Sequence, residues 1–263
     1  MKLYRIYGIT LRYLFLFRHS INKVADAFYW PVIDLLLWGL TITYVRSANP
    51  GSDNFIMVVI SGLLLWQVVW RGQYEITISL LEDLWNKNLI NIFTTPLKLN
   101  EWIVSVIVLG IIKAFISLVF ASAVALFLYQ VKILFYGFYL IPFVLLLFMT
   151  GWWVGFFVAG IILRYGTKLE QLAWSTIYLI SPFSGIYYPI SILPVWAQKV
   201  SYLIPTSYIF EGSREVIQKG YLADVSKLWN CLILNLVYLV ISLIFFKKSY
   251  NKVLENKGLV KVF

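Results

Sequence analysis

Apolar residues follow one another in six long runs along this chain, and short polar stretches separate the runs. A helix needs about 20 mostly apolar residues to cross the hydrocarbon core of a bilayer, and most of these runs approach or exceed that length. We therefore expect six transmembrane helices. They cover residues 28–45, 55–70, 102–129, 138–163, a stretch that begins at 172, and residues 228–246, and the second helix has room to continue through residue 74.

The composition agrees with a chain that lies mostly in the membrane. Apolar residues make up 61% and charged residues 13% of the 263 residues, whereas soluble domains average about 45–50% and about 25%. Alternating segments of about ten residues, which the strands of a membrane barrel would need, are absent. The predicted fold class is therefore an all-α integral membrane protein, and residues 1–263 form a single transmembrane domain.

The first 26 residues carry polar side chains on one helical stripe and apolar or aromatic side chains opposite. Arg5, Arg12, His19 and Lys23 belong to the polar stripe. A basic amphipathic helix of this kind lies in the plane of an anionic membrane surface. We expect residues 1–26 to form such an interfacial helix. The alternative is a helix outside the membrane that packs against the rest of the protein.

Residues 76–101, between the second and third runs, form the one long polar interruption of the chain. From Glu82 to Phe93, charged and amide side chains alternate with apolar ones, and Thr94-Thr95-Pro96 follows as a stop signal. This pattern predicts a short helix with one polar and one apolar face. In a membrane protein such a helix lies on the membrane surface or docks into a partner.

A second unusual segment lies before the last run. The fifth apolar run meets Pro182, Gly185 and Pro189 before it is long enough to cross, and residues 189–212 are too apolar for an ordinary loop. Pro194 and Pro205 divide this segment into pieces too short to span a bilayer. Irregular backbone at membrane depth must be covered by protein or line a cavity. We therefore expect re-entrant half-helices over residues 189–218, between the fifth and sixth spans.

The distribution of basic residues predicts the orientation. Six spans place both termini on one side, and that side holds most of the lysines and arginines, in the N-terminal segment, residues 71–98, residues 164–168 and the C-terminal tail. By the positive-inside rule both termini and residues 76–101 face the cytoplasm, in the inner (plasma) membrane. The net charge of +10 follows this orientation, so we expect no nucleic-acid partner.

Several classes of chemistry lack the residues they need. The chain has one cysteine, Cys231, and one histidine, His19, which excludes an internal disulfide and a Cys/His metal site. No phosphate-binding loop of the Gly-x-x-x-x-Gly-Lys-Ser/Thr type is present, so a nucleotide that drives this protein would bind to a separate subunit. We expect no catalytic residues and no metal.

Two charges lie inside predicted spans. Asp34 is in the first and Lys113 in the third, and a charge at that depth costs at least about 2.5–3.5 kcal/mol unless it meets protein or water. Both lie toward the cytoplasmic half, so they could pair with each other. They are candidates to line a substrate path, and the alternatives are a structural salt bridge or a lysine that reaches along its neighbours toward the interface.

Two further pairs have helical spacing. Arg71 and Glu75 are four residues apart, and Glu211 and Arg214 are three residues apart, so each can form an ion pair. Either pair could be a solvated surface contact worth less than about 1 kcal/mol, and either could instead belong to a gate. Aromatic residues, 18% of the chain, are typical of interfacial belts, and they also suit stacking on a sugar or lipid.

Four motifs in order resemble the transmembrane subunits of type-two ABC exporters, which include drug, lipo-oligosaccharide and polysaccharide exporters. The first is Trp30-Pro-Val-Ile-Asp34, and the second is residues 82–101 with their ending Thr-Pro-Leu-Lys-Leu-Asn-Glu. The others are Tyr188-Pro-Ile-Ser-Ile-Leu-Pro194 and Ile204-Pro-Thr-Ser-Tyr-Ile-Phe-Glu-Gly-Ser-Arg214. The resemblance covers essentially the whole chain, and the N-terminal part looks closer to the drug and lipo-oligosaccharide branch than to the polysaccharide branch.

The resemblance implies a permease subunit without enzymatic activity of its own. A second copy, most simply as a homodimer, would complete a path for an amphiphilic substrate, and two cytosolic ATPase subunits would bind ATP and magnesium. A coupling helix would lie at about residues 79–95, and two gate helices on the outer side would lie at about residues 190–218. The residues implied for contact with the ATPase are Glu82, Asp83, Trp85, Asn88, Leu89 and Phe93, and those implied for the gate are Pro194, Pro205, Tyr208, Glu211 and Arg214.

Two other classes remain as alternatives. A proton- or ion-coupled secondary transporter would use Asp34, Lys113 and Glu75 as a relay, although the sequence has no inverted internal repeat. A membrane-embedded enzyme acting on lipids would need a cluster of acids and bases at one interface, which the sequence does not contain.

Overall fold

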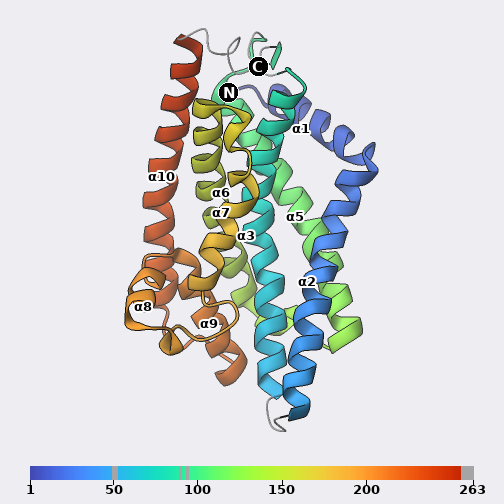
Figure 1. Ribbon diagram of the computed structural model, residues 1–263, viewed down its shortest axis with the longest axis vertical. Coiled ribbons are helices and arrows are strands. Elements are labelled where there is room, and N and C mark those ends of the chain that lie inside the picture. The colour runs from blue at the N-terminus through green and yellow to red at the C-terminus, as the bar shows by residue number, and fades with distance from the viewer. Residues whose placement is uncertain (49–52, 89–90, 93–94, 256–263) are drawn as a thin grey trace.

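The computed structural model describes residues 1–48, 53–88, 91–92 and 95–255, and these residues form helices, turns and no strand. Long helices lie side by side along the long axis of the molecule, and short ones gather at one end (Figure 1). In chain order the helices are α1 Leu3–Arg18, α2 Ile21–Ala48, α3 Asp53–Trp85, α5 Leu99–Tyr129, η1 Ile133–Tyr139, α6 Leu140–Tyr165, η2 Thr167–Leu169, α7 Leu172–Ile180, η3 Ser181–Phe183, η4 Ile190–Ile192, α8 Val195–Ser201, α9 Pro205–Lys219 and α10 Ser226–Glu255.

Five stretches of the described chain are long and apolar enough to cross a membrane. They are Ile21–Val45, Phe55–Trp85, Leu99–Tyr129, Ile133–Tyr165 and Ser226–Val253. They correspond to the first four spans and the last span expected from the sequence. The expected fifth span starts at Leu172 as predicted, but α7 has only nine residues and is about 14 Å long. Helix α7 therefore does not reach across a bilayer by itself.

Helix α3 runs through the middle of the bundle, with α2 and α5 on one side and α6, α7 and α10 on the other (Figure 1). It is the most buried of the five long apolar helices. Polar residues continue the helix where the sequence had suggested an end at residue 70 or 74. That boundary was wrong because Arg71, Gln73 and Glu75 find partners on neighbouring helices, so the backbone has no need to leave the bundle there.

Small residues bring α3 and α6 into close contact. Gly151, Gly155 and Ala159 are spaced four residues apart, and all three are buried on the inward face of α6, a spacing that lets another helix approach closely. A Cβ atom on Gly151 would lie 2.7 Å from the carbonyl oxygen of Val69 and 3.0 Å from the Cα of Gly72. Both are backbone atoms of α3, so the two helices could not accommodate a side chain there without moving apart.

The N-terminal 26 residues are not one helix. Helix α1 ends at Arg18, and α2 begins at Ile21 and continues through Pro31, which the sequence analysis had placed at the start of the first span. A proline within a helix has no N–H for the carbonyl four residues earlier, here Ala27. The hydroxyl of Ser117 on α5 donates a hydrogen bond of 3.0 Å to that carbonyl. The neighbouring helix thus satisfies the group that Pro31 leaves unpaired.

The two prolines that divide the segment before the last span do begin separate short helices. Pro194 precedes α8 as its N-cap residue, and Pro205 is the first residue of α9. Helices α8 and α9 lie at one end of the bundle, and α1 and the last turns of α10 lie at the other end (Figure 1). The expected short helices between residues 189 and 218 are therefore present.

We predict that Gly151→Ala lowers the free energy of unfolding of the purified protein by about 1–3 kcal/mol, since overpacking of a close helix contact has costs of this size. The measurement is thermal unfolding in detergent. Gly8→Ala on α1 is the matched control, because a Cβ at Gly8 would meet no atom within 4 Å. Equal stability of the two variants would contradict the close approach of α3 and α6.

Candidate functional site

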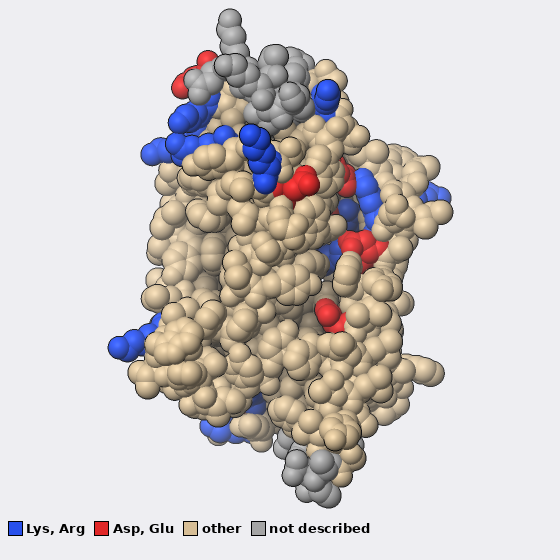
Figure 2. All heavy atoms as spheres, viewed as in Figure 1, with Lys and Arg blue, Asp and Glu red and all other residues tan. Residues whose placement is uncertain are grey.

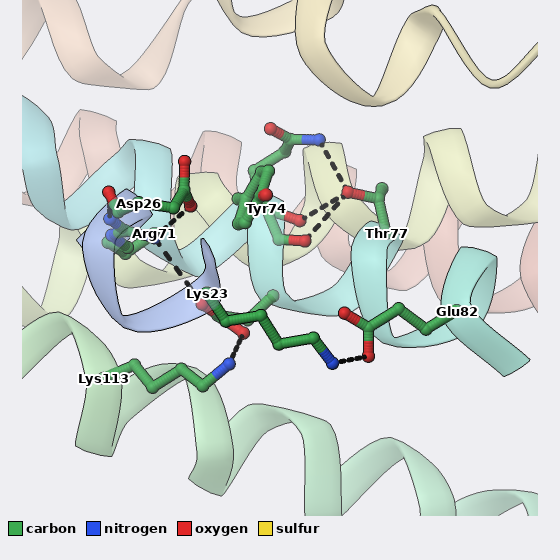
Figure 3. A network of polar contacts seen from close by, with 9 residues as sticks. Lys23, Asp26, Arg71, Tyr74, Thr77, Glu82 and Lys113 are labelled. Atoms are coloured by element: carbon green, nitrogen blue, oxygen red, sulfur yellow. Dashed lines mark hydrogen bonds and ion pairs between the residues drawn. The ribbon is translucent and has the colours of Figure 1, made fainter. Parts of the chain in front are cut away.

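Four charged side chains form a network at the junction of α2, α3 and α5 (Figure 3). Nη1 of Arg71 lies 3.3 Å from Oδ2 of Asp26 and 3.8 Å from Oε1 of Glu75, and Nζ of Lys113 lies 2.6 Å from Oε2 of Glu75. Arg71 also donates a hydrogen bond of 2.7 Å from Nη2 to the backbone carbonyl of Asp26. Two cations and two carboxylates thus neutralise one another within the bundle.

The balance of positive and negative charge affects stability because these side chains are buried. The side chains of Arg71 and Glu75 are 2% and 1% exposed, and that of Lys113 is 8% exposed. An unpaired charge in such surroundings would be strongly destabilising. The ammonium of Lys113 also lies 4.6 Å from the ring centroid of Phe17 on α1, so the network connects four helices. The predicted Arg71–Glu75 pair is confirmed, and its interpretation as a solvated surface pair is wrong.

Asp34 and Lys113 do not pair with each other in this structure. Lys113 is bound to Glu75, whereas Oδ2 of Asp34 accepts a hydrogen bond of 3.2 Å from Nε2 of Gln67 on α3. The sequence placed both residues at a suitable depth but gave no information on the rotation of each helix about its axis. A relay through Asp34, Glu75 and Lys113 would need contacts that differ from these.

A second group of contacts joins α1 to the end of α3. Arg12 Nη2 lies 2.6 Å from Oδ1 of Asp83, and Tyr13 donates a 2.5 Å hydrogen bond to the other carboxylate oxygen. Trp102 donates its indole N–H to the Tyr13 hydroxyl at 3.1 Å. Burial, and next the charge of Asp83, raise the pKa of Tyr13 well above its ordinary value, so the phenol keeps its proton. Asp83 therefore holds α1 against α3.

Glu101 anchors the extreme N-terminus. Its carboxylate is fully buried and accepts hydrogen bonds from the backbone N–H of Lys2 at 2.8 Å and of Lys98 at 2.9 Å. Arg5 lies 3.5 Å away as a counter-ion. The N–H of Lys98 is a capping contact at the start of α5, so one side chain both begins that helix and ties the N-terminal segment to it.

The residues implied for contact with an ATPase fall into three groups. Asp83 is buried, and Glu82 forms a 2.7 Å ion pair with Lys23, so both have partners within the chain. Trp85 is 47% exposed at the end of α3, and Asn88 follows the turn after it. Leu89 and Phe93 lie outside the described residues. The separate helix expected at residues 79–95 is instead, up to Trp85, the last part of α3.

The predicted Glu211–Arg214 pair is confirmed, with Nη1 of Arg214 3.0 Å from Oε1 of Glu211. Arg214 also donates from Nη2 to the carbonyl of Tyr188 at 2.8 Å and to that of Gly185. Glu211 in turn accepts the backbone N–H of Ile190 at 2.9 Å. The pair thus fastens the loop before η4 onto α9. Tyr208 contributes a 2.9 Å hydrogen bond to the carbonyl of Tyr202, which joins α9 to the end of α8.

Sequence reasoning missed Asp26, Arg12, Tyr13, Lys23 and Glu101 as members of these contacts. Arg12 and Lys23 had been placed on the polar stripe of an interfacial helix, and the structure shows that they and Asp26 contact α3 of the bundle. Within the described residues, no group of three or more His, Cys, Asp or Glu side chains gathers in a way that could hold a metal ion.

Comparison with known proteins gives one result. A family model described as "ABC-2 type transporter" matches residues 14–217. A search of curated proteins finds no match. The matched range begins within α1 and ends within α9, so it covers the charge network, the end of α3 and the loop that Arg214 holds.

We predict that removing one partner of the Glu75–Lys113 pair lowers the free energy of unfolding more than removing both partners. Glu75→Gln or Lys113→Met would leave a buried charge without its partner, at a cost of about 3–5 kcal/mol, whereas the double variant leaves the Arg71–Asp26 pair neutral. A double-mutant cycle measured by unfolding in detergent should therefore be clearly non-additive. The more exposed pair Lys23–Glu82 is the control and should couple by less than about 1 kcal/mol. Additive effects at Glu75 and Lys113 would show that the network does not hold the helices.

We also predict that Arg214→Lys destabilises the loop over residues 185–190 although it keeps the charge. An ammonium cannot reproduce the fork of N–H groups that binds Glu211 and two carbonyls, and each buried carbonyl left without a donor costs about 1–3 kcal/mol. The expected result is a lower melting temperature and faster protease cleavage within residues 185–190. Arg164→Lys, at an exposed arginine, should change neither property, and an unaltered cleavage rate in Arg214→Lys would contradict the fastening role.

Proposed function

Because this chain belongs to the ABC-2 type transporter family and is a multi-pass membrane permease, we propose that it forms, with a second copy of itself, the export path of an ATP-driven transporter. The observation that carries the proposal is the family match over most of the chain together with five long apolar helices. Separate cytosolic ATPase subunits would bind ATP and magnesium. The substrate would be an amphiphile such as a lipid, a glycolipid or polysaccharide, or a drug-like molecule.

The proposed topology has six crossings with both termini in the cytoplasm. Helix α6 ends near α1, and α10 begins at the end where α8 and α9 lie (Figure 1). Residues 166–225 must therefore lead from one end of the bundle to the other. We propose that α7 and η3 make most of the fifth crossing and that α8 and α9 complete it as re-entrant helices at the outer face. The excess of basic residues at the end that holds α1 supports the orientation.

Force would enter at the cytoplasmic end of α3. Helix α3 is continuous from Asp53 to Trp85. Displacement of the segment after Trp85 would therefore move the whole helix, including Arg71 and Glu75. The contacts of Asp83 with Arg12 and Tyr13 would make α1 move with it. The ATPase must bind the two states of the path with different affinities, since a partner with equal affinity for both shifts neither.

The substrate would pass beside α3 and leave past α8 and α9 at the outer face. Asp34 and Lys113 are the residues proposed for the path. Pro194, Pro205, Tyr208, Glu211 and Arg214 are those proposed for the gate, in which the Glu211–Arg214 pair would hold the loop over α9 closed. The contacts of Lys113 with Glu75 give no support to the ion-coupled alternative, in which Asp34 and Lys113 would exchange a proton or ion.

The test is co-purification of the tagged chain with cytosolic ABC-type ATPase subunits co-expressed from the same genome. We predict that Leu89→Asp combined with Phe93→Asp abolishes capture of the ATPase, because two carboxylates on the apolar face of the segment would prevent its entry into a groove. Size-exclusion chromatography would check that the membrane fold is intact.

The matched control is Asn91→Asp combined with Thr95→Asp, which adds the same charge at the same spacing, at polar positions of the same segment. Asn91 and Thr95 are both exposed, so this variant should retain the ATPase. Capture by the Leu89/Phe93 variant would show that the docking site lies elsewhere. If the wild-type chain captures no ATPase, the exporter proposal itself is wrong.

A further inference from the structure

Asp34 differs from the other acidic residues of the bundle. Asp26, Glu75, Glu82, Asp83 and Glu101 each have a lysine or arginine within 4.0 Å. Among the described residues, Asp34 has no such partner, and its carboxylate accepts a hydrogen bond from the Gln67 side chain. It is half-buried within α2, well inside the stretch Ile21–Val45 that is long enough to cross the membrane. A carboxylate at this depth needs a positive partner or water.

The residue that binds Asp34 also has an unused acceptor. Gln67 is 5% exposed, and its Nε2 donates to Asp34, which leaves Oε1 buried without a hydrogen-bond donor in the described part of the chain. Buried polar atoms are rarely left unpaired, so such an atom requires an explanation. The carboxylate and the amide oxygen are both acceptors, and they come from α2 and α3. Each of them can accept a hydrogen bond from a positively charged group with N–H bonds.

Aromatic rings surround this pair of acceptors. Trp38 lies one turn after Asp34 on α2, and its ring stacks on that of Tyr187 with centroids 4.5 Å apart. Tyr178 and Tyr187 lie close enough to Asp34 to interact with it electrostatically. Trp70, one turn after Gln67 on α3, lies 5.1 Å from Tyr178, centroid to centroid. Aromatic faces attract cations and also bury the apolar part of an amphiphile.

The position of these groups argues against contact with lipid. Tyr178 is 56% exposed, and Trp38 and Tyr187 are partly exposed, so the group is open on one side. Figure 2 shows acidic groups, with basic groups beside some of them, in hollows of a face that is otherwise mostly uncharged at mid-height. A carboxylate and tyrosine hydroxyls that faced lipid tails would have no partners. We therefore expect the opening to face water, a bound molecule or the second copy.

We propose that Asp34 and Gln67, with the rings of Trp38, Tyr178 and Tyr187, bind the protonated amine of a cationic amphiphile that this protein exports. This inference rests on the proposed function and narrows its substrate class. The ammonium forms an ion pair with Asp34 and donates a second hydrogen bond to Oε1 of Gln67, and the apolar part lies against the rings. Lys113 cannot serve Asp34 instead, because Glu75 holds it at 2.6 Å.

The probe is dodecylamine, and its matched analogues are dodecyltrimethylammonium, which has no N–H bonds, and dodecanol, which has no charge. Binding is measured by equilibrium dialysis on the full-length protein in nanodiscs, against empty nanodiscs. The wild type should bind dodecylamine at least about tenfold more tightly than either analogue. Equal binding of dodecanol would overturn the proposal, and equal binding of dodecyltrimethylammonium would overturn the role of Gln67.

Single-residue variants test which side chains bind dodecylamine. Asp34→Asn and Gln67→Leu should each weaken dodecylamine binding about tenfold or more, whereas Asp224→Asn, which removes one exposed carboxylate near the start of α10, should leave it unchanged. Unaltered binding in Asp34→Asn would overturn the site. If Asp34→Asn does not fold, the order of the three probes on the wild type still decides the proposal.

These outcomes separate the site from the proposed function, because binding is measured without the ATPase. If the ATPase is captured and dodecylamine shows no preference for Asp34, the exporter stands and the amine site is wrong. If dodecylamine binds as expected and no ATPase is captured, the site stands and the mode of transport is wrong.

Discussion

The need to neutralise charge inside an apolar bundle governs this structure. Helix α3 carries Arg71, Glu75, Glu82 and Asp83 through or beside the hydrocarbon region, and a charge left unpaired there would cost several kcal/mol. Each of these residues meets a partner from α1, α2 or α5. The arrangement of the first four long helices is therefore determined as much by these pairs as by the packing of apolar side chains.

The sequence predicts those features that depend on local pattern. The lengths of the apolar runs predicted both ends of α5 and α6 and the start of α10 to within a few residues. Pro194 and Pro205 predicted where α8 and α9 start. The i,i+4 and i,i+3 spacings predicted the Arg71–Glu75 and Glu211–Arg214 pairs. In each case the deciding interaction lies within one helix or one turn, where the chain itself sets the distance.

Features that depend on tertiary contacts were not predictable in the same way. The end of α3 was placed too early because Arg71 and Glu75 resemble the edge of a span, and only the positions of Asp26 and Lys113 show that they are paired inside it. Likewise, no periodicity could tell that Lys113 faces Glu75 while Asp34 faces Gln67, since that depends on how α2 and α5 are rotated against α3. Residues 1–26 showed a polar stripe, but the partner of that stripe was the bundle.

The way in which α2 is attached to the bundle has a consequence for motion. Polar contacts that hold α2 include Lys23 on Glu82, Arg71 on Asp26, Ser117 on the carbonyl of Ala27, Gln67 on Asp34, and the Tyr129 hydroxyl on the carbonyl of Leu35. In a bilayer, an apolar side chain gains little free energy when it contacts protein instead of lipid acyl chains. Polar bonds such as these therefore contribute strongly to helix association. Water could take over the hydrogen bonds to the carbonyls of Ala27 and Leu35 at small net cost, whereas the ion pairs of Asp26 and Lys23 weaken as water raises the local dielectric constant. The hold on α2 therefore depends on how dry its contacts with α3 and α5 stay, and water that entered between these helices would loosen α2.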